Sequence, residues 1–398
     1  MTTLIRPHRD SLLLGLVALP LGLVIGALDA LFGRVLLTLT DFRMEHVHAL
    51  LPFLAIAGVV MVWCYQTFGG TSGKGMTLLF EAGQGKTDAI PFRLIPLVMV
   101  STWLTHLFGG SAGREGVAVQ MGGTLAHHVG KRLPLPNAGR QLLLAGMAAG
   151  FAGLFRTPIA ATFFALEVFT AGVLEYQALF PALVASFTAS ACSGLLGLEK
   201  FSVPLTDQLP FSGALVGKLL LFGVLFGITG GLFAWSLGKL KGFCTARLPN
   251  PLRRIFWIGV LVSAVSLLCW DGRYSGLGTN LIAMSFDGGC FSWDFALKFL
   301  FTLVTLAAGF QGGEVTPLFS IGASLGVLLG TLFGLPAPFV AALGYAAVFG
   351  GATNTLLAPM LIGAEVFGFS YLPYFFLVCA MAYLCNGNAS IYPLQQGR

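Results

Sequence analysis

The sequence predicts an all-α polytopic membrane protein, and three observations support this fold class. Only 10% of the 398 residues are charged, against about 25% in an average soluble domain. Hydrophobic residues make up 56% of the chain, with 35 phenylalanines, and apolar runs recur along its whole length. The chain also carries 53 glycines, which let membrane helices pack closely and break. So few charges could not cover a soluble surface, so the composition excludes a soluble enzyme, a disordered chain and a nucleic-acid-binding protein.

The apolar runs define the expected helices in order. The first, near 11–31, follows a basic end that holds Arg6, His8 and Arg9. No small-residue cleavage site follows it, which favours a membrane helix over a secretory signal, and the basic end places the N-terminus in the cytoplasm. Further runs lie near 49–68, 91–110, 142–168, 173–198, 211–238, 255–270, 294–310, 315–334, 337–349 and 356–385.

Many of these runs are shorter than the roughly 20 residues that a straight span needs. Gly and Pro also interrupt them, as at 109–113, Gly312-Gly313 and Pro158. Uneven, interrupted segments are typical of the tilted and broken helices of secondary transporters. No hydrophilic stretch is long enough for a separate cytoplasmic domain, so we expect residues 1–398 to form one transmembrane domain. Two basic clusters are expected in cytoplasmic loops: Lys131, Arg132 and Arg140, and Lys239, Lys241, Arg247, Arg253 and Arg254.

The chain repeats itself. Residues 146–169 align with 344–367 without gaps, and ten of the 24 positions are identical, where chance would give roughly two or three. Upstream, Gly113-Arg114-Glu115 lies opposite Gly313-Glu314-Val315. Two similar halves, about 10–200 and 205–394, with a site between them form a transporter layout. The alternative is that the two similar helices are only small-residue packing surfaces.

Three Gly-rich segments each precede an expected helix start: GGTSGKGM (69–76), GGSAGREGVAVQMGG (109–123) and GFQGGEVTP (309–317). A helix start has unpaired backbone N–H groups and the positive end of the helix dipole, and both attract anions. Three such starts converging near the bilayer midplane would bind an anion without a full buried positive charge, so the anion could also leave. The alternative is that these glycines serve only packing or loop turns.

Glu115 lies between glycines in the second of these segments. Charged groups at membrane depth usually line a pathway. An ionised Glu115 could occupy an anion site as a tethered competitor, whereas a protonated one would be neutral and could swing away. Such a residue could couple anion movement to proton movement. The alternative is an ion pair with Arg114 that has no transport role.

These segments carry a resemblance to a known family. Residues 113–120, GREGVAVQ, resemble the GREGPxVQ signature of the CLC family of anion channels and anion/proton antiporters. GGEVTPLFSIGASLG (312–326) resembles the family's GGxFxPxLxxGAxxG element, and SIYPL (390–394) matches the place of its anion-coordinating tyrosine. The resemblance covers about residues 15–394. It implies an inverted repeat of tilted and broken helices, a homodimer and one pore per subunit, with Glu115 as gating glutamate and Tyr392 as central tyrosine.

The departures from the chloride-type pattern are also informative. Met76 follows Gly73-Lys74-Gly75 where the family has GSGIP, Val117 replaces the Pro of GREGP, and Val168 falls at the internal proton-transfer glutamate. Together they resemble the bacterial fluoride-exporting branch, which implies fluoride/proton antiport across the bacterial inner membrane. The resemblance points to an anion site at Gly113, Arg114, Gly116, Met76, Val315, Thr316 and Tyr392, and to a proton-transfer or structural role for Glu314.

The chemistry of these residues suits fluoride, which is small and strongly hydrated and needs short, strong hydrogen bonds. The hydroxyls of Thr316 and Tyr392 and the backbone N–H groups are suitable donors. Met76 brings no hydroxyl, which should weaken chloride coordination, or it merely fills an apolar gap. Tyr392 could instead be an interfacial aromatic. A chloride-selective channel or chloride/proton exchanger of the same fold stays open as an alternative.

The sequence gives no sign of enzymatic chemistry. Gly85-Lys86-Thr87 resembles the tail of a P-loop, but Phe80 stands where its first glycine should be. No HExxH motif occurs and none of the seven cysteines forms a CxxC pair, so we expect no metal site and no cofactor. The expected partners are fluoride, protons, the lipid bilayer and a second copy of the chain. Glu167 and Glu365 end the paired helices, and we expect them to bond the N–H groups of nearby helix starts; the alternative is a role in transport.

Overall fold

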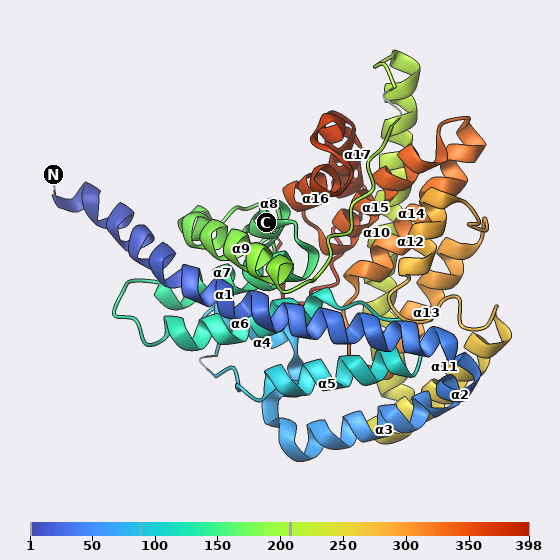
Figure 1. Ribbon diagram of the computed structural model, residues 1–398, viewed down its shortest axis with the longest axis horizontal. Coiled ribbons are helices and arrows are strands. Elements are labelled where there is room, and N and C mark those ends of the chain that lie inside the picture. The colour runs from blue at the N-terminus through green and yellow to red at the C-terminus, as the bar shows by residue number, and fades with distance from the viewer. Residues whose placement is uncertain (1, 88, 207–208, 398) are drawn as a thin grey trace.

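The computed structural model describes residues 2–87, 89–206 and 209–397, and within these ranges every long element is a helix (Figure 1). The side chains of residues 2–8 lie outside the description, so Arg6 and His8, which suggested the orientation of the N-terminus, are not placed. The first half contains α1 Thr2–Glu45, α2 Val47–Leu50, α3 Leu54–Cys64, α4 Met76–Gly83, α5 Leu94–Leu107, α6 Glu115–Gly130, α7 Ala138–Phe155, α8 Pro158–Glu167 and α9 Leu179–Leu195.

The second half lies beside the first and is coloured yellow-green to red in Figure 1. It contains α10 Gly213–Arg247, α11 Pro251–Leu268, α12 Thr279–Asp287, α13 Asp294–Ala308, α14 Val315–Phe333, α15 Ala337–Thr353, α16 Leu357–Phe367 and α17 Leu372–Leu384.

The outside of the molecule is suited to lipid. Seven helical stretches within the described ranges are long and apolar enough to cross a membrane. Large apolar side chains such as Leu16, Leu268 and Leu332 are exposed on the surface, which in a soluble protein would expose far too much apolar area. The prediction of an all-α polytopic membrane protein is confirmed.

Glycines make the same helix contacts in both halves. A side chain on Gly122 of α6 would collide with the carbonyl oxygen of Gly146 on α7, and one on Gly322 of α14 would collide with that of Gly344 on α15. Gly146 and Gly344 are matching positions of the repeat, and Gly122 and Gly322 are as far apart in the sequence as Gly113 and Gly313. The sequence repeat therefore corresponds to a repeated close approach of two backbones.

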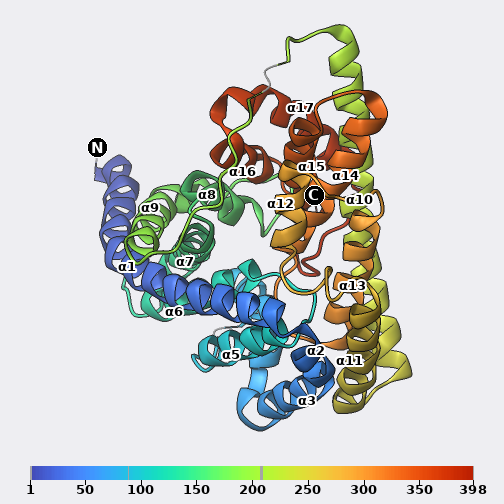
Figure 2. The ribbon, with the colours of Figure 1, turned by 45° about the vertical axis from the view of Figure 1, so that its right-hand side comes forward.

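The two halves also cap each other's helices, where α8 and α16 meet near the centre of Figure 2. The Glu167 carboxylate, at the end of α8, accepts hydrogen bonds from the backbone N–H groups of residues 356–358 at the start of α16, at 2.8–3.2 Å. The Glu365 carboxylate, at the end of α16, accepts from Ile159 N (3.2 Å) and Ala160 N (2.7 Å) at the start of α8. The prediction that these glutamates bond helix N-termini is confirmed.

One expectation about the loops is wrong. Lys239, Lys241 and Arg247 lie in α10, and Arg253 and Arg254 lie in α11, so only a short turn separates the two helices. The apolar run near 211–238 ends before the helix does, because long basic side chains can extend towards water from a helix that continues past its apolar part. Arg140 likewise lies in α7, whereas Lys131 and Arg132 follow the end of α6 as expected.

Candidate functional site

The starts of α6 and α14 face each other at the centre of the molecule. Gly113 and Gly313, just before the two helices, exchange backbone hydrogen bonds: Gly113 N donates to Gly313 O (2.5 Å) and Gly313 N donates to Gly113 O (2.8 Å). A Cβ atom on Gly113 would lie 2.6 Å from Glu115 Oε2 and 2.9 Å from Gly313 O. Glycine is therefore required here for the two helix starts to meet.

The Glu115 carboxylate is fully buried and lies in a cradle of donors from both helix starts. Its Oε2 atom accepts hydrogen bonds from Arg114 N (3.0 Å) and Thr316 N (3.0 Å), and the Thr316 hydroxyl donates to Oε1. These donors are two backbone N–H groups and one hydroxyl, the type of donor that stabilises an anion at a helix N-terminus. The carboxylate oxygens thus mark a position where a small anion would be held.

The Arg114 guanidinium takes no part in this cradle. Arg114 forms none of the ion pairs among the described residues, and its Nε and Nη1 atoms are buried without a hydrogen-bond partner. Its Cζ atom lies over the ring of Phe155, 5.9 Å from the centroid. The structure therefore does not show the ion pair between Glu115 and Arg114 that was the alternative to a transport role.

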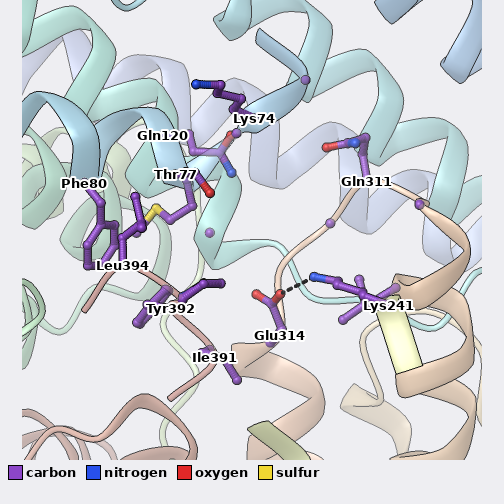
Figure 3. Close-up of a pocket in the computed structure, with 18 of the residues that line it drawn as sticks. Lys74, Thr77, Phe80, Gln120, Lys241, Gln311, Glu314, Ile391, Tyr392 and Leu394 are labelled. Carbon is purple, nitrogen blue, oxygen red and sulfur yellow. Dashed lines mark ion pairs between the residues drawn. The ribbon is translucent and has the colours of Figure 1, made fainter. Parts of the chain in front are cut away.

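Beside the cradle is a cavity of about 230 Å³, shown in Figure 3 and called here the first cavity. Four of the residues predicted from the sequence line it: Met76, Gly116, Glu314 and Tyr392. The others, Gly113, Arg114, Glu115, Val315 and Thr316, are absent from its lining and lie around the buried carboxylate of Glu115 or in the apolar core. The structure therefore divides the predicted residues between an enclosed cradle and an open cavity.

The third Gly-rich segment also reaches the first cavity. Helix α4 begins at Met76, directly after Gly75, whose φ of +54° is readily adopted only by glycine. A Cβ atom on Gly75 would lie 3.2 Å from Oε1 of Gln120 on α6. The starts of α4, α6 and α14 are thus gathered in one place, as the sequence predicted. Met76 is partly buried against the apolar core, so it fills a gap as well as lining the cavity.

Tyr392 is 7% exposed and lies against Phe80 and Phe164, with ring centroids 5.4 and 6.2 Å away. The C-terminal segment that carries it is fixed by Ile391 N donating to Ala352 O (2.9 Å) and by Gln84 Nε2 donating to Leu394 O (2.6 Å). This buried position excludes an interfacial role for Tyr392. Val315 is buried in the apolar core, so only its backbone is available to an anion.

Five further polar residues line the first cavity and were not predicted as site residues from the sequence: Lys74, Thr77, Gln120, Lys241 and Gln311. Gln120 lies one helical turn after Gly116, and this spacing could have indicated it, because residues four apart share a helix face. Lys241 of α10 lies with its Nζ atom 4.0 Å from Glu314 Oε1, an ion pair drawn in Figure 3. No sequence pattern links these two residues, because only the packing of α10 brings them together.

Known proteins resemble this chain in sequence and in fold. The profile of the family described as "Voltage gated chloride channel" matches residues 57–387. A protein of Pseudomonas syringae pv. tomato named "Chloride/fluoride channel protein" is 37% identical over 393 residues, covering 96% of this chain and 85% of that protein. The "H(+)/Cl(-) exchange transporter ClcA" of Vibrio cholerae is 26% identical over 347 residues, covering 82% and 72%.

Two solved structures resemble the fold. The crystal structure of a CLC-type fluoride/proton antiporter has a TM-score of 0.95 and 52% identity, and the match covers 97% of this chain and 98% of that one. The crystal structure of a slow cyanobacterial Cl⁻/H⁺ antiporter has a TM-score of 0.84 and 21% identity, with 95% and 96% covered. At 21% identity, the match to the cyanobacterial antiporter shows a similar fold and nothing more.

Proposed function

The chain belongs to the voltage-gated chloride channel (CLC) family, and from that premise we propose that it is a fluoride/proton antiporter that exports fluoride from the bacterial cytoplasm. The observation that carries the proposal is the buried Glu115 carboxylate, held by the Thr316 hydroxyl and by N–H groups from two helix starts. The name of the solved antiporter at 52% identity also favours fluoride. The family consists of membrane transport proteins, and the chain spans the membrane several times.

The proposed cycle uses one set of donors for two occupants. With Glu115 ionised, its carboxylate fills the cradle. Fluoride entering from the first cavity competes for the Thr316 and Arg114 donors and displaces the carboxylate, which then takes up a proton and becomes neutral. When the fluoride leaves, the acid releases its proton and returns. One site therefore alternates between fluoride and a carboxylate, which links the two movements.

Lys241 and Glu314 set the charge of the first cavity in this proposal. Glu314 alone would repel an entering anion, and the Lys241 ammonium 4.0 Å away offsets that charge. Met76 offers no hydroxyl at the same cavity, where the uncharged side-chain donors are Thr77, Gln120, Gln311 and Tyr392. The cradle beside it adds the Thr316 hydroxyl and backbone N–H groups. These donors suit a small anion that gains most from short hydrogen bonds.

We further propose the arrangement of the whole protein. Residues 1–398 act as one transport domain made of two halves, about 10–200 and 205–394. Two copies pair as a homodimer in the bacterial inner membrane, each with its own pathway and with a cytoplasmic N-terminus. The contacts that cross between the halves, such as the reciprocal caps from Glu167 and Glu365, support a single unit.

The first test is a flux measurement with purified protein in liposomes loaded with fluoride or chloride. We expect fluoride efflux, recorded with an ion-selective electrode, to be accompanied by proton uptake from the external medium, and chloride efflux to be small. Comparable chloride flux would favour the alternative, a chloride channel or chloride/proton exchanger. Fluoride flux without proton movement would contradict antiport.

A second test concerns the donor at the centre of the cradle. Thr316→Val keeps the shape of the side chain but removes the hydroxyl that donates to Glu115. We expect about tenfold slower fluoride transport, since a hydrogen bond to a charged group is worth about 1.5–3 kcal/mol. Thr316→Ser restores the hydroxyl and should retain most of the activity. Equal activity of the Val and Ser variants would show that the hydroxyl does not bind the transported anion.

A further inference from the structure

A second cavity, of about 240 Å³, lies between the end of α1 and the segment 270–284. It shares no lining residue with the first cavity. The two lie at opposite ends of α11, whose 18 residues span about 27 Å at 1.5 Å per residue. Arg254, near the start of α11, donates to Ala308 O (3.3 Å) beside the first cavity, and Trp270, just past its end, lines the second. The length of α11 therefore separates the second cavity from the first.

Arg43 is the main charge of the second cavity. Its side chain is only 4% exposed and lines the cavity, with Nη1 donating to His106 O at 2.7 Å. Arg43 belongs to none of the ion pairs found among the described residues. A buried guanidinium without a carboxylate is costly unless something else offsets its charge.

The other charges near the cavity are already engaged or exposed. Arg273 is paired with Asp294, with Nη2 to Oδ2 at 2.6 Å. Asp271 lies on the rim with 71% of its side chain exposed, where its Oδ1 atom is 3.5 Å from His48 Nε2. Among the described charged residues of the cavity wall, only Arg43 is buried and forms no ion pair, and the acidic group that acts on it, Asp41, is exposed to solvent.

Two further donors line the same cavity. The Ser275 hydroxyl is buried, with the residue 3% exposed, and has no hydrogen-bond partner. Helix α12 begins in the cavity wall at Thr279, after Gly278, and no side chain caps its first N–H groups. A buried cation, an unpartnered hydroxyl and an uncapped helix start thus bring three kinds of donor to one cavity.

The size and surroundings of the cavity indicate the class of anion. A volume of about 240 Å³ leaves room for a group with several oxygen atoms. A guanidinium, a hydroxyl and a helix start are together suited to the several oxygens of a phosphate group. Apolar side chains of Met44, Val47 and Met284 complete the wall. Beside it the rings of Trp270 and Phe291 both stack on Trp293, in partly exposed positions. Aromatic residues are common at the level of lipid headgroups.

We propose that the second cavity binds a phosphate group, supplied by a phospholipid headgroup or by inorganic phosphate, through Arg43, the Ser275 hydroxyl and the start of α12. The site shares no lining residue with the first cavity, from which fluoride is proposed to enter. A bound phosphate would brace the segment 274–278, whose Gly276 exchanges backbone hydrogen bonds with Gly110 (N to O, 3.1 Å) and Ala112 (O to N, 3.3 Å) in the loop before Glu115.

The test uses the thermal unfolding midpoint of the full-length protein in phospholipid-free detergent. One series adds sodium phosphate, with sodium chloride of equal ionic strength as reference. A second series adds dioleoylphosphatidylglycerol, with dioleoylglycerol, which has the same chains but no phosphate, as reference. We expect a saturable stabilisation of the wild type over the reference in at least one series. Stabilisation by free phosphate assigns that ion, and stabilisation by the phospholipid alone assigns a headgroup.

Variants decide whether this cavity is responsible. R43Q should bind the stabilising ligand at least about tenfold more weakly, and S275A about threefold more weakly. R34Q, which changes an exposed arginine of the same helix, should respond as the wild type does. The proposal is overturned if neither series stabilises the wild type, or if R43Q responds like R34Q. Should R43Q not fold, S275A decides, and an unchanged affinity of S275A overturns the proposal.

Discussion

Glu115→Gln is expected to abolish proton uptake driven by an outward fluoride gradient. Glutamine has nearly the same shape as glutamic acid and still offers an oxygen to the donors of Thr316 and Arg114. It cannot ionise, however, so it can neither compete as an anion nor carry a proton. Proton uptake in liposomes should fall to that of protein-free liposomes. The measurement is the external pH trace recorded during fluoride efflux.

The control for this variant is Glu199→Gln, which changes an exposed glutamate outside the helices and should leave both fluxes unchanged. Both variants should elute from gel filtration as the wild type does, so that a loss of flux reports coupling rather than misfolding. Proton uptake by Glu115→Gln at the wild-type rate would exclude Glu115 as the coupling residue. The fold and the family would be unaffected by that outcome.

Much of the fold could be predicted because membrane helices leave strong signals. The low charge and the apolar runs predict helices through the bilayer, and the repeat of 146–169 in 344–367 predicts two related halves. The reciprocal capping by Glu167 and Glu365 was also accessible, because an acidic residue at a repeated position suggests a repeated bond. The end of α10 was not predicted, because hydropathy falls at Lys239 while the helix continues to Arg247.

The features of the candidate site that depend on local backbone structure could be predicted from the sequence, whereas the contacts that depend on helix packing could not. Gly75, Gly113 and Gly313 each indicated a helix start, and the three helix starts lie close together. The sequence could not show that Thr316 donates to Glu115, since the two residues come from different halves. It also gave no sign of Lys241 beside Glu314, or of Arg43 buried without a counter-charge.

Glu167→Ala is expected to destabilise the protein more than the same change at the related position Glu365. The Glu167 side chain is almost completely buried. Without its carboxylate, the backbone N–H groups of residues 356–358 lose their hydrogen-bond acceptor. An unsatisfied buried donor costs about 1–3 kcal/mol, so the loss of the acceptor for three donors should lower the thermal unfolding midpoint in detergent by about 4 °C or more. Glu365 is more exposed and accepts from only two N–H groups, so water can replace it in part.

The glutamine variants separate capping from transport. Glu167→Gln keeps one acceptor oxygen for the start of α16 and should lower the unfolding midpoint less than Glu167→Ala does. Because Glu167 is bound to that helix start and lines neither cavity, the folded Gln variant should still couple fluoride efflux to proton uptake. Loss of coupling in a Glu167→Gln protein of near wild-type stability would instead assign Glu167 to the proton pathway. An equal loss of stability in Glu167→Ala and Glu365→Ala would show that burial does not set the strength of the two caps.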